Sequence, residues 1–139
     1  MMTVSELVER AFKVAVPCQH GQDCEAGGVG AALETEAGDC FVGVCIDVPS
    51  GIGFCAEHAA IAAMVTAGQS RVKRVVAVTC DGHIVPPCGR CRQFLLSVND
   101  GNTDTEVVLG PDEIMTLEEL MPRRWQGGMG HHGGSGCVL

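Results

Sequence analysis

Two stretches of the chain share one pattern, in which a cysteine stands at the start of an apparent helix. The first is "FCAEHAAIAAM", where the helical pattern begins at Cys55 and ends before Gly68. The second is "PPCGRCRQFLL", where a helix is expected from Cys88 to Val98. The buried strand pattern "VKRVVAVTC" lies between them. Such an alternation favours a layered α/β fold and raises the question of whether the two cysteine-led helix starts meet.

The rest of the chain continues the alternation of helix and strand patterns. Its first 16 residues have the apolar spacing of an amphipathic helix, residues 17–28 read as a loop, and residues 116–122 read as a last helical turn or two. Strands are expected at 29–35, 40–47, 72–80 and 105–110. This order predicts a mixed sheet flanked by helices.

Length and composition predict one domain followed by a tail. The chain has 139 residues, of which 46% are apolar, enough for a single core. Residues 126–139 include six glycines and two histidines. The domain is therefore expected at 1–125, and a flexible Gly/His-rich tail at 126–139.

Charge and cysteine usage narrow the class of function. A net charge of −8 with no basic run argues against a nucleic acid polymer or a membrane surface as partner. Neither a signal peptide nor an apolar run of spanning length is evident, so the cytoplasm is expected. Nine cysteines, an odd number, suit free thiols and a metal site in a reducing compartment.

The spacing of Cys88 and Cys91 allows both sulfurs to face one ion. A C-x-x-C unit alone fits a structural zinc, a catalytic zinc, a redox dithiol or coincidence. A catalytic zinc needs three protein ligands and an open position, and Cys55 can be the third. Glu57 would then lie near the open position, able to move protons without ligating the metal. A structural zinc needs a fourth ligand, and no further Cys or His is evidently well placed close to either motif.

The helix starts also matter electrostatically. Three thiolates give a zinc site a formal charge of −1, which opposes the acidification of water. The positive end of a helix stabilises each thiolate by about 0.3–1 kcal/mol and lowers its pKa. Arg90, Arg92 and His58 are near enough in sequence to offset the remaining charge.

"CAEHAAIAA" followed by "PPCGRCRQFLL" resembles the zinc-dependent cytidine deaminase family, whose motif pairs such stretches. "VGAAL", "FVGV", "CRQ" and "TLEELMP" resemble that family in the same order, so the resemblance covers about residues 1–125. It implies a three-layer α/β/α sandwich with a mixed sheet of about five strands and one Zn²⁺ per chain on Cys55, Cys88 and Cys91. It further implies that Glu57 moves protons between the activated water, the ring nitrogen and the departing ammonia. Small members usually form homotetramers.

Several residues depart from the family pattern around the expected nucleoside. An aromatic residue usually precedes "VGAA", where this chain has Gly27 and Gly28, and the usual Asn-x-Glu is here Cys45-Ile46-Asp47. Asp47 can still accept a hydrogen bond from a sugar hydroxyl, and Cys45 cannot replace an amide. His58 stands where an arginine is usual. Asp47, Cys45 and Ala56 are the candidate substrate contacts.

The resemblance implies hydrolytic removal of ammonia from a cytosine-type nucleoside such as cytidine or deoxycytidine, as in pyrimidine salvage. The "PCGRCRQ" motif and the glycine-bearing loop before "CAE" resemble the blasticidin S deaminase branch, so a cytosine-bearing nucleoside antibiotic is the alternative substrate. A non-catalytic zinc module is the alternative from another class. A thiol-redox protein is a further alternative, but it leaves Cys55 and Glu57 without a role.

Overall fold

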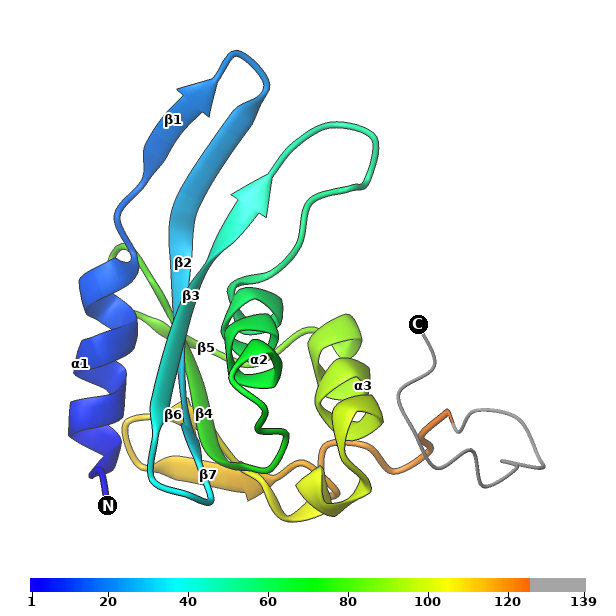
Figure 1. Ribbon diagram of the computed structural model, residues 1–139. Helices are drawn as coiled ribbons and strands as arrows, with labels where there is room; N and C mark the ends of the chain where they lie inside the picture. Colours follow the sequence, from blue (N-terminus) through cyan, green and yellow to red (C-terminus); the bar gives the residue numbers. More distant parts are fainter. Residues whose placement is uncertain (126–139) are drawn as a thin grey trace.

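The computed structural model describes residues 1–125, which form a β-sheet with helices on both faces (Figure 1). The helices are α1 (Val4–Val14), α2 (Ala56–Thr66), α3 (Gly89–Val98) and the 3-10 helix η1 (Asp100–Asp104). The strands are β1 (Cys18–Gly21), β2 (Cys24–Thr35), β3 (Cys40–Asp47), β4 (Val72–Thr79), β5 (Ile84–Val85), β6 (Glu106–Gly110) and β7 (Glu113–Thr116).

The sheet is mixed and has seven strands in its described part. Its main order is β1-β2-β4-β6-β7, with β3 paired to β2 and β5 paired to β4. Strands β4 and β6 are parallel, whereas the hairpin of β2 and β3 is antiparallel over most of its length. The predicted α/β class, with a mixed sheet between helices, is confirmed, and the sheet has seven strands where about five were expected.

One local prediction was wrong and another was confirmed. Residues 17–28 were expected to be a loop, but they form β1 and the start of β2, which extend as a two-stranded arm beyond the helices (Figure 1). All four residues of β1 are exposed, so the arm lacks the apolar alternation that marks a strand in sequence. Residues 116–122 were expected to be a last helical turn or two, and they contain one such turn, in which the N–H of Leu120 donates to the carbonyl of Thr116 at 3.3 Å. The N–H of the buried Leu117 also donates to the carbonyl of Thr105 at 2.9 Å. Pro122 ends this segment after a single turn.

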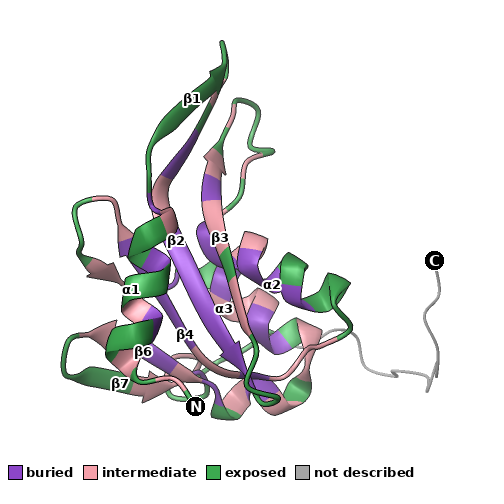
Figure 2. Cartoon of the chain, turned by 60° about the vertical axis from the view of Figure 1, so that its left-hand side comes forward, coloured by how far each residue is buried: buried purple, intermediate pink, exposed green. Residues whose placement is uncertain are grey.

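The core lies in two layers, one on each face of the sheet. Helix α1 packs on one face and helices α2 and α3 on the other, and buried residues follow the central strands β2 and β4 (Figure 2). The α1 layer is built from Leu7, Ala11, Ala32, Val76, Val78 and Val108. The opposite layer is larger and includes Leu33, Ile61, Met64, Val75, Leu95 and Leu117. Both cysteine-led helices thus cover the same face of the sheet.

A glycine on β3 lets α2 lie unusually close to the sheet. A Cβ atom at Gly43 would lie 2.5 Å from the Cβ of Ala59 and 2.5 Å from the backbone nitrogen of Ala60. Because such contacts are shorter than carbon packing allows, only glycine permits this helix position. The helix that bears Cys55 and Glu57 at its start therefore depends on a small residue in the neighbouring strand.

Within residues 1–125, every helix is too short or too polar to cross a lipid bilayer. The expected tail at 126–139 lies outside the described residues.

Candidate active site

The starts of α2 and α3 meet at one point above the sheet. Cys55 is the N-cap of α2 and Cys88 is the N-cap of α3, both with extended backbone dihedrals. Their sulfurs lie 3.5 Å apart, and the sulfur of Cys88 lies 3.5 Å from that of Cys91 in the first turn of α3. Neither side chain makes a capping hydrogen bond to its own helix. The two sulfurs meet because the starts of the two helices are neighbours in the fold.

The spacing of these sulfurs suits one tetrahedral ion. Sulfur ligands at about 2.3 Å from a zinc ion are about 3.8 Å apart when the geometry is tetrahedral. The separations of 3.5 Å from Cys88 to Cys55 and from Cys88 to Cys91 are close to this value. The sulfurs of Cys55 and Cys91 also lie within 4.8 Å of each other. Cys55, Cys88 and Cys91 are therefore close enough to share a metal, as the motif spacing predicted, but their ligand roles stay predictions.

A fourth donor is present in the same cluster, contrary to the expectation from sequence. The Nδ1 atom of His58 lies 3.3 Å from the sulfur of Cys91. The donor atoms of Cys55, His58 and Cys91 all lie within 4.8 Å of one another, so this trio can hold one zinc ion. The imidazole stacks on Phe94 with ring centroids 4.6 Å apart and 11° between planes. Because α2 positions His58 one residue after Glu57, helical spacing places it near Cys55, and that signal was available in the sequence.

Glu57 is a buried carboxylic acid beside the sulfurs. Its residue is 5% exposed, in the first turn of α2. Burial raises the pKa of Glu57 above its usual range, although hydrogen bonds from its own backbone and from Cys91 act in the opposite direction. A raised pKa suits a group that must both accept and donate protons near neutral pH. The desolvated position is the physical cause, as in other acids held in low-polarity sites.

The three thiols differ in acidity in the metal-free chain. Burial raises the pKa of Cys91 strongly, and the negative charges of Glu57 and Cys55 add to this effect. Burial also raises the pKa of Cys55. At Cys88 burial acts in the same direction, but the backbone N–H groups of Cys91 and Arg90 and the neighbouring thiols outweigh it and lower the pKa. The N-terminus of α3 thus favours the thiolate at Cys88.

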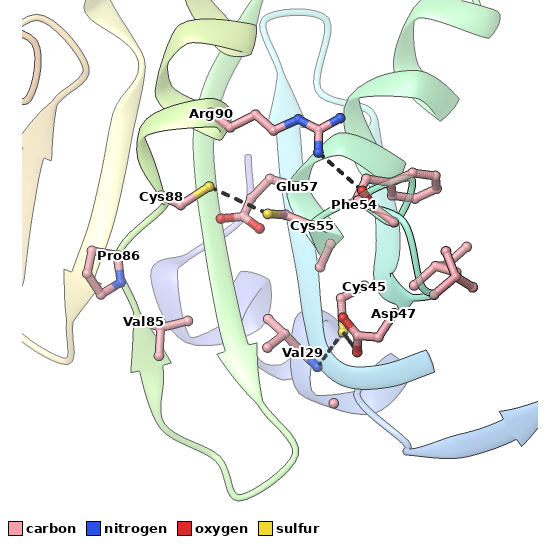
Figure 3. Close-up of a pocket in the computed structure, with 16 residues that line it drawn as sticks. Val29, Cys45, Asp47, Phe54, Cys55, Glu57, Val85, Pro86, Cys88 and Arg90 are labelled. Atoms are coloured by element: carbon pink, nitrogen blue, oxygen red, sulfur yellow. Dashed lines mark hydrogen bonds between the residues drawn. The ribbon is translucent and has the colours of Figure 1, made fainter. Parts of the chain in front are cut away.

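The cluster forms one end of a cavity of about 700 Å³. In Figure 3, Cys55, Cys88 and Glu57 lie on one side of this cavity, and Val29, Cys45 and Asp47 lie on another. Such a volume is in the range of small-molecule sites. All three candidate substrate contacts line it, namely Cys45, Asp47 and Ala56, and their roles stay predictions.

The thiol of Cys45 makes two hydrogen bonds to other residues of the protein. The backbone N–H of Val29 donates to its sulfur at 3.3 Å, and the thiol donates to Oδ2 of Asp47 at 3.8 Å (Figure 3). These two contacts occupy both the acceptor and the donor of the thiol. The carboxylate of Asp47 is exposed and retains acceptor capacity. On this wall of the cavity, Asp47 is therefore better suited than Cys45 to bond a ligand.

Backbone contacts hold the loop that precedes Cys55. Phe54 exchanges two hydrogen bonds with Ile46 at the end of β3, at 3.0 and 3.1 Å. Arg90 donates from Nη1 to the carbonyl oxygen of Gly53 at 3.1 Å, which connects the start of α3 to this loop (Figure 3). The structure thus gives Arg90 a structural contact that the sequence did not predict, whereas its offset of thiolate charge stays a prediction. Sequence reasoning also gave no role to Phe94, because a ring on α3 stacking on His58 of α2 is a tertiary contact.

The fold agrees with a solved structure of related sequence. The crystal structure of cytidine deaminase from Mycobacterium tuberculosis superimposes with a TM-score of 0.75 at 26% identity, covering 91% of this chain and 99% of that one. In sequence, the cytidine deaminase of the same species is 38% identical over 97 residues, which are 69% of this chain and 65% of that relative. The aligned region thus spans just under two thirds of this relative's length.

The alignments with two other relatives cover a larger share of the relative's length. A cytidine deaminase from Halalkalibacterium halodurans is 31% identical over 126 residues, covering 87% of this chain and 89% of the relative. Blasticidin-S deaminase from Bacillus cereus is 32% identical over 109 residues, covering 70% and 76%.

A family model confirms the resemblance and the predicted dependence on zinc. The model described as "Cytidine and deoxycytidylate deaminase zinc-binding region" matches residues 1–105, which include both cysteine motifs. The match covers well over half of the chain. The chain therefore belongs to the cytidine and deoxycytidylate deaminase zinc-binding family.

Proposed function

We propose that this protein is a zinc-dependent hydrolase that removes ammonia from a cytosine-type nucleoside and leaves the uracil form. One observation supports this most: the sulfurs of Cys55, Cys88 and Cys91 lie close together beside a cavity that is lined by Cys55, Cys88 and the buried acid Glu57. Family membership gives the same reaction class. A reaction of this kind would act in pyrimidine salvage.

In this proposal Cys55, Cys88 and Cys91 hold the metal. The zinc ion, when bound, supplies Lewis acidity that makes a water reactive near neutral pH. Glu57 accepts a proton from the attacking water and delivers it to the ring nitrogen beside the reacting carbon. The carboxylate then takes the remaining proton from the hydroxyl that has been added to the carbon and delivers it to the amine, so that the carbonyl forms, the carbon–nitrogen bond breaks and ammonia leaves. Asp47 accepts a hydrogen bond from a hydroxyl group of the sugar.

Replacing Glu57 by Gln tests this assignment. Glu57→Gln keeps the shape of the side chain but cannot cycle a proton, so one zinc per chain should remain while ammonia release falls by at least about 100-fold. The matched control is Glu118→Gln, which changes an exposed glutamate outside the cavity. Full activity in Glu57→Gln would contradict the role of this residue. Screening cytidine, deoxycytidine, cytosine and blasticidin S in the same assay identifies the substrate.

His58 favours a second candidate, a closed structural zinc site. Its Nδ1 atom is 3.3 Å from the sulfur of Cys91, so imidazole and three sulfurs together would complete four ligands and leave no position for water. Metal content separates the two candidates. In the catalytic site, His58→Gln retains one zinc per chain and Cys88→Ala loses it. In a closed site that includes His58, His58→Gln weakens zinc binding severely, and the wild-type chain releases no ammonia from any cytosine compound.

We further propose that the chain acts as a homo-oligomer, a tetramer by family resemblance, in a reducing compartment such as the cytoplasm. Exposed apolar residues near the cavity and on α2 support an interface, including Ile52 at 74% and Val65 at 48% exposure. The eight cysteines within residues 1–125 are all free thiols, which suits a reducing compartment. Light scattering coupled to size exclusion tests the oligomer directly, and a monomeric mass would contradict it.

A further inference from the structure

Arg92 bonds two segments that are far apart in the chain. Its Nε donates to the carbonyl oxygen of Pro87 at 2.9 Å, and its Nη1 donates to the carbonyl oxygen of Leu120 at 3.2 Å. The first acceptor belongs to the residue immediately before Cys88. The second lies in the turn segment 117–121 that follows β7. One guanidinium group therefore spans the loop at the proposed metal site and the C-terminal part of the described chain.

The segment 117–121 is a fixed point in the fold. Leu117 is fully buried, and its N–H donates to the carbonyl of Thr105 at 2.9 Å. The N–H of Glu118 donates to the carbonyl of Thr103 at 3.0 Å. Leu120 itself packs against the larger core layer. The carbonyl that accepts from Arg92 thus belongs to a residue that packs on the core and follows two residues bonded to η1 and its end.

The loop that ends at Cys88 has fewer means of fixing itself. It follows the two-residue strand β5, and Pro86 and Pro87 have no backbone N–H to donate. Cys88 is exposed, unlike the buried Cys91. A hydrogen bond from a side chain outside the loop to the carbonyl of Pro87 can therefore orient the loop.

We propose that Arg92 is a positioning residue that fixes Cys88 at the metal site by bonding the Pro87 carbonyl to the core-attached segment 117–121. The inference rests on the proposed function, because it takes Cys88 as a zinc ligand. A guanidinium group suits this task, since its planar fork presents donors on separate nitrogens in a fixed geometry. Residues that orient metal ligands commonly change metal affinity by about 10–100-fold when removed.

Zinc affinity of Arg92 variants tests the proposal. Chelator competition should show about 10–100-fold weaker zinc binding in Arg92→Ala than in the wild type. Arg92→Lys keeps the charge and much of the stem but carries all its donors on one nitrogen, so an intermediate loss is expected. Gln93→Ala is the control on the same helix, where a bond of 2.8 Å to Ser97 is lost. Val107→Ala is the control for general destabilisation, because it removes core volume in β6.

A second readout needs no metal. Hydrogen exchange of the zinc-free chain should become faster in Arg92→Ala at both 88–91 and 117–121, and in neither segment in Gln93→Ala. If Arg92→Ala binds zinc as well as Val107→Ala does, the positioning role is overturned and the proposed function stands. If the wild-type chain binds no zinc, the proposed function fails, and exchange at the two segments alone decides whether Arg92 orders them together.

Discussion

The sulfur of Cys55 lies 3.5 Å from the sulfur of Cys88, although 33 positions separate the two residues in the chain. Each sulfur is held at the N-cap of its own helix, and both helices lie on the same face of the sheet. The proposed metal site thus depends on how two helices pack, and several measurements follow from that dependence.

Cys88 should be needed for zinc although it is the most exposed sulfur of the three. Cys88→Ser replaces a thiolate by a hydroxyl that stays protonated, so zinc affinity should fall by at least about 10-fold. Cys80→Ser is the matched control, since this cysteine lies outside the cavity lining. Metal content of the purified variants by mass spectrometry measures both. Equal zinc in the two variants would remove Cys88 from the ligand set.

Glu57 should destabilise the metal-free protein as pH rises. Its folded-state pKa is raised by burial, so between the unfolded and folded pKa values the native state binds more protons than the unfolded state. The free energy of unfolding therefore falls as pH rises through this window. Glu57→Gln removes this term, so the zinc-free variant should gain stability relative to the wild type as pH rises above about 4.5.

Urea unfolding of both zinc-free proteins from pH 4 to pH 7 measures this difference, in which the titration of the thiols largely cancels. Glu118→Gln serves as the exposed control and should follow the wild type. A stability difference for Glu57→Gln that does not change with pH would contradict the raised pKa.

Gly43→Ala should displace α2 and weaken the site at its start. The new Cβ atom would lie 2.5 Å from atoms of Ala59 and Ala60, so we expect a loss of about 1–3 kcal/mol in unfolding free energy. Zinc affinity should fall as well, because α2 carries Cys55. Gly110→Ala is the control, since its Cβ would meet only the Cβ of Glu113 at 3.8 Å. Equal stability of the two variants in urea would show that α2 tolerates the shift.

Asn102→Ala should cost stability without touching the cavity. Its fully buried amide accepts from the N–H of Val72 at 2.9 Å and donates to the carbonyls of Ser70 and Leu95 at 3.0 and 2.8 Å. Removing it leaves buried backbone groups without partners, and we expect about 2–5 kcal/mol of destabilisation. Asn102→Asp should be worse, because an oxygen would face the two carbonyls. Unfolding within 0.5 kcal/mol of wild type, roughly the range of neutral surface changes, would refute this account.

Asp47 should affect substrate binding more than turnover. If its carboxylate accepts a sugar hydroxyl, Asp47→Asn should raise KM by about 10–100-fold, equivalent to about 1.5–3 kcal/mol for a hydrogen bond to a charged group. The thiol of Cys45 donates to the same carboxylate, so its orientation is already set by the protein. Asp112→Asn, an exposed aspartate outside the cavity lining, is the control. An unchanged KM in steady-state kinetics would exclude this contact.

The amino-acid pattern alone was enough to predict the α/β class, the two cysteine-led helices and the family. These features are local: an apolar period of 3.6 or 2, a breaker such as Gly68, and a cysteine at a helix start can all be read within a few residues. The polar strand β1 could not be predicted in this way because all four of its residues are exposed and show no apolar alternation.

Only the tertiary structure decided what surrounds the sulfurs. Three contacts join segments that are separate in the chain. The ring of His58 stacks on Phe94, and the thiol of Cys45 bonds to Val29 and Asp47. The guanidinium group of Arg92 bonds to the carbonyl of Leu120. Spacing along a chain indicates which residues can share a helix face, but it does not predict the distance between two helices. That distance is set by close packing, here by the absence of a side chain at Gly43.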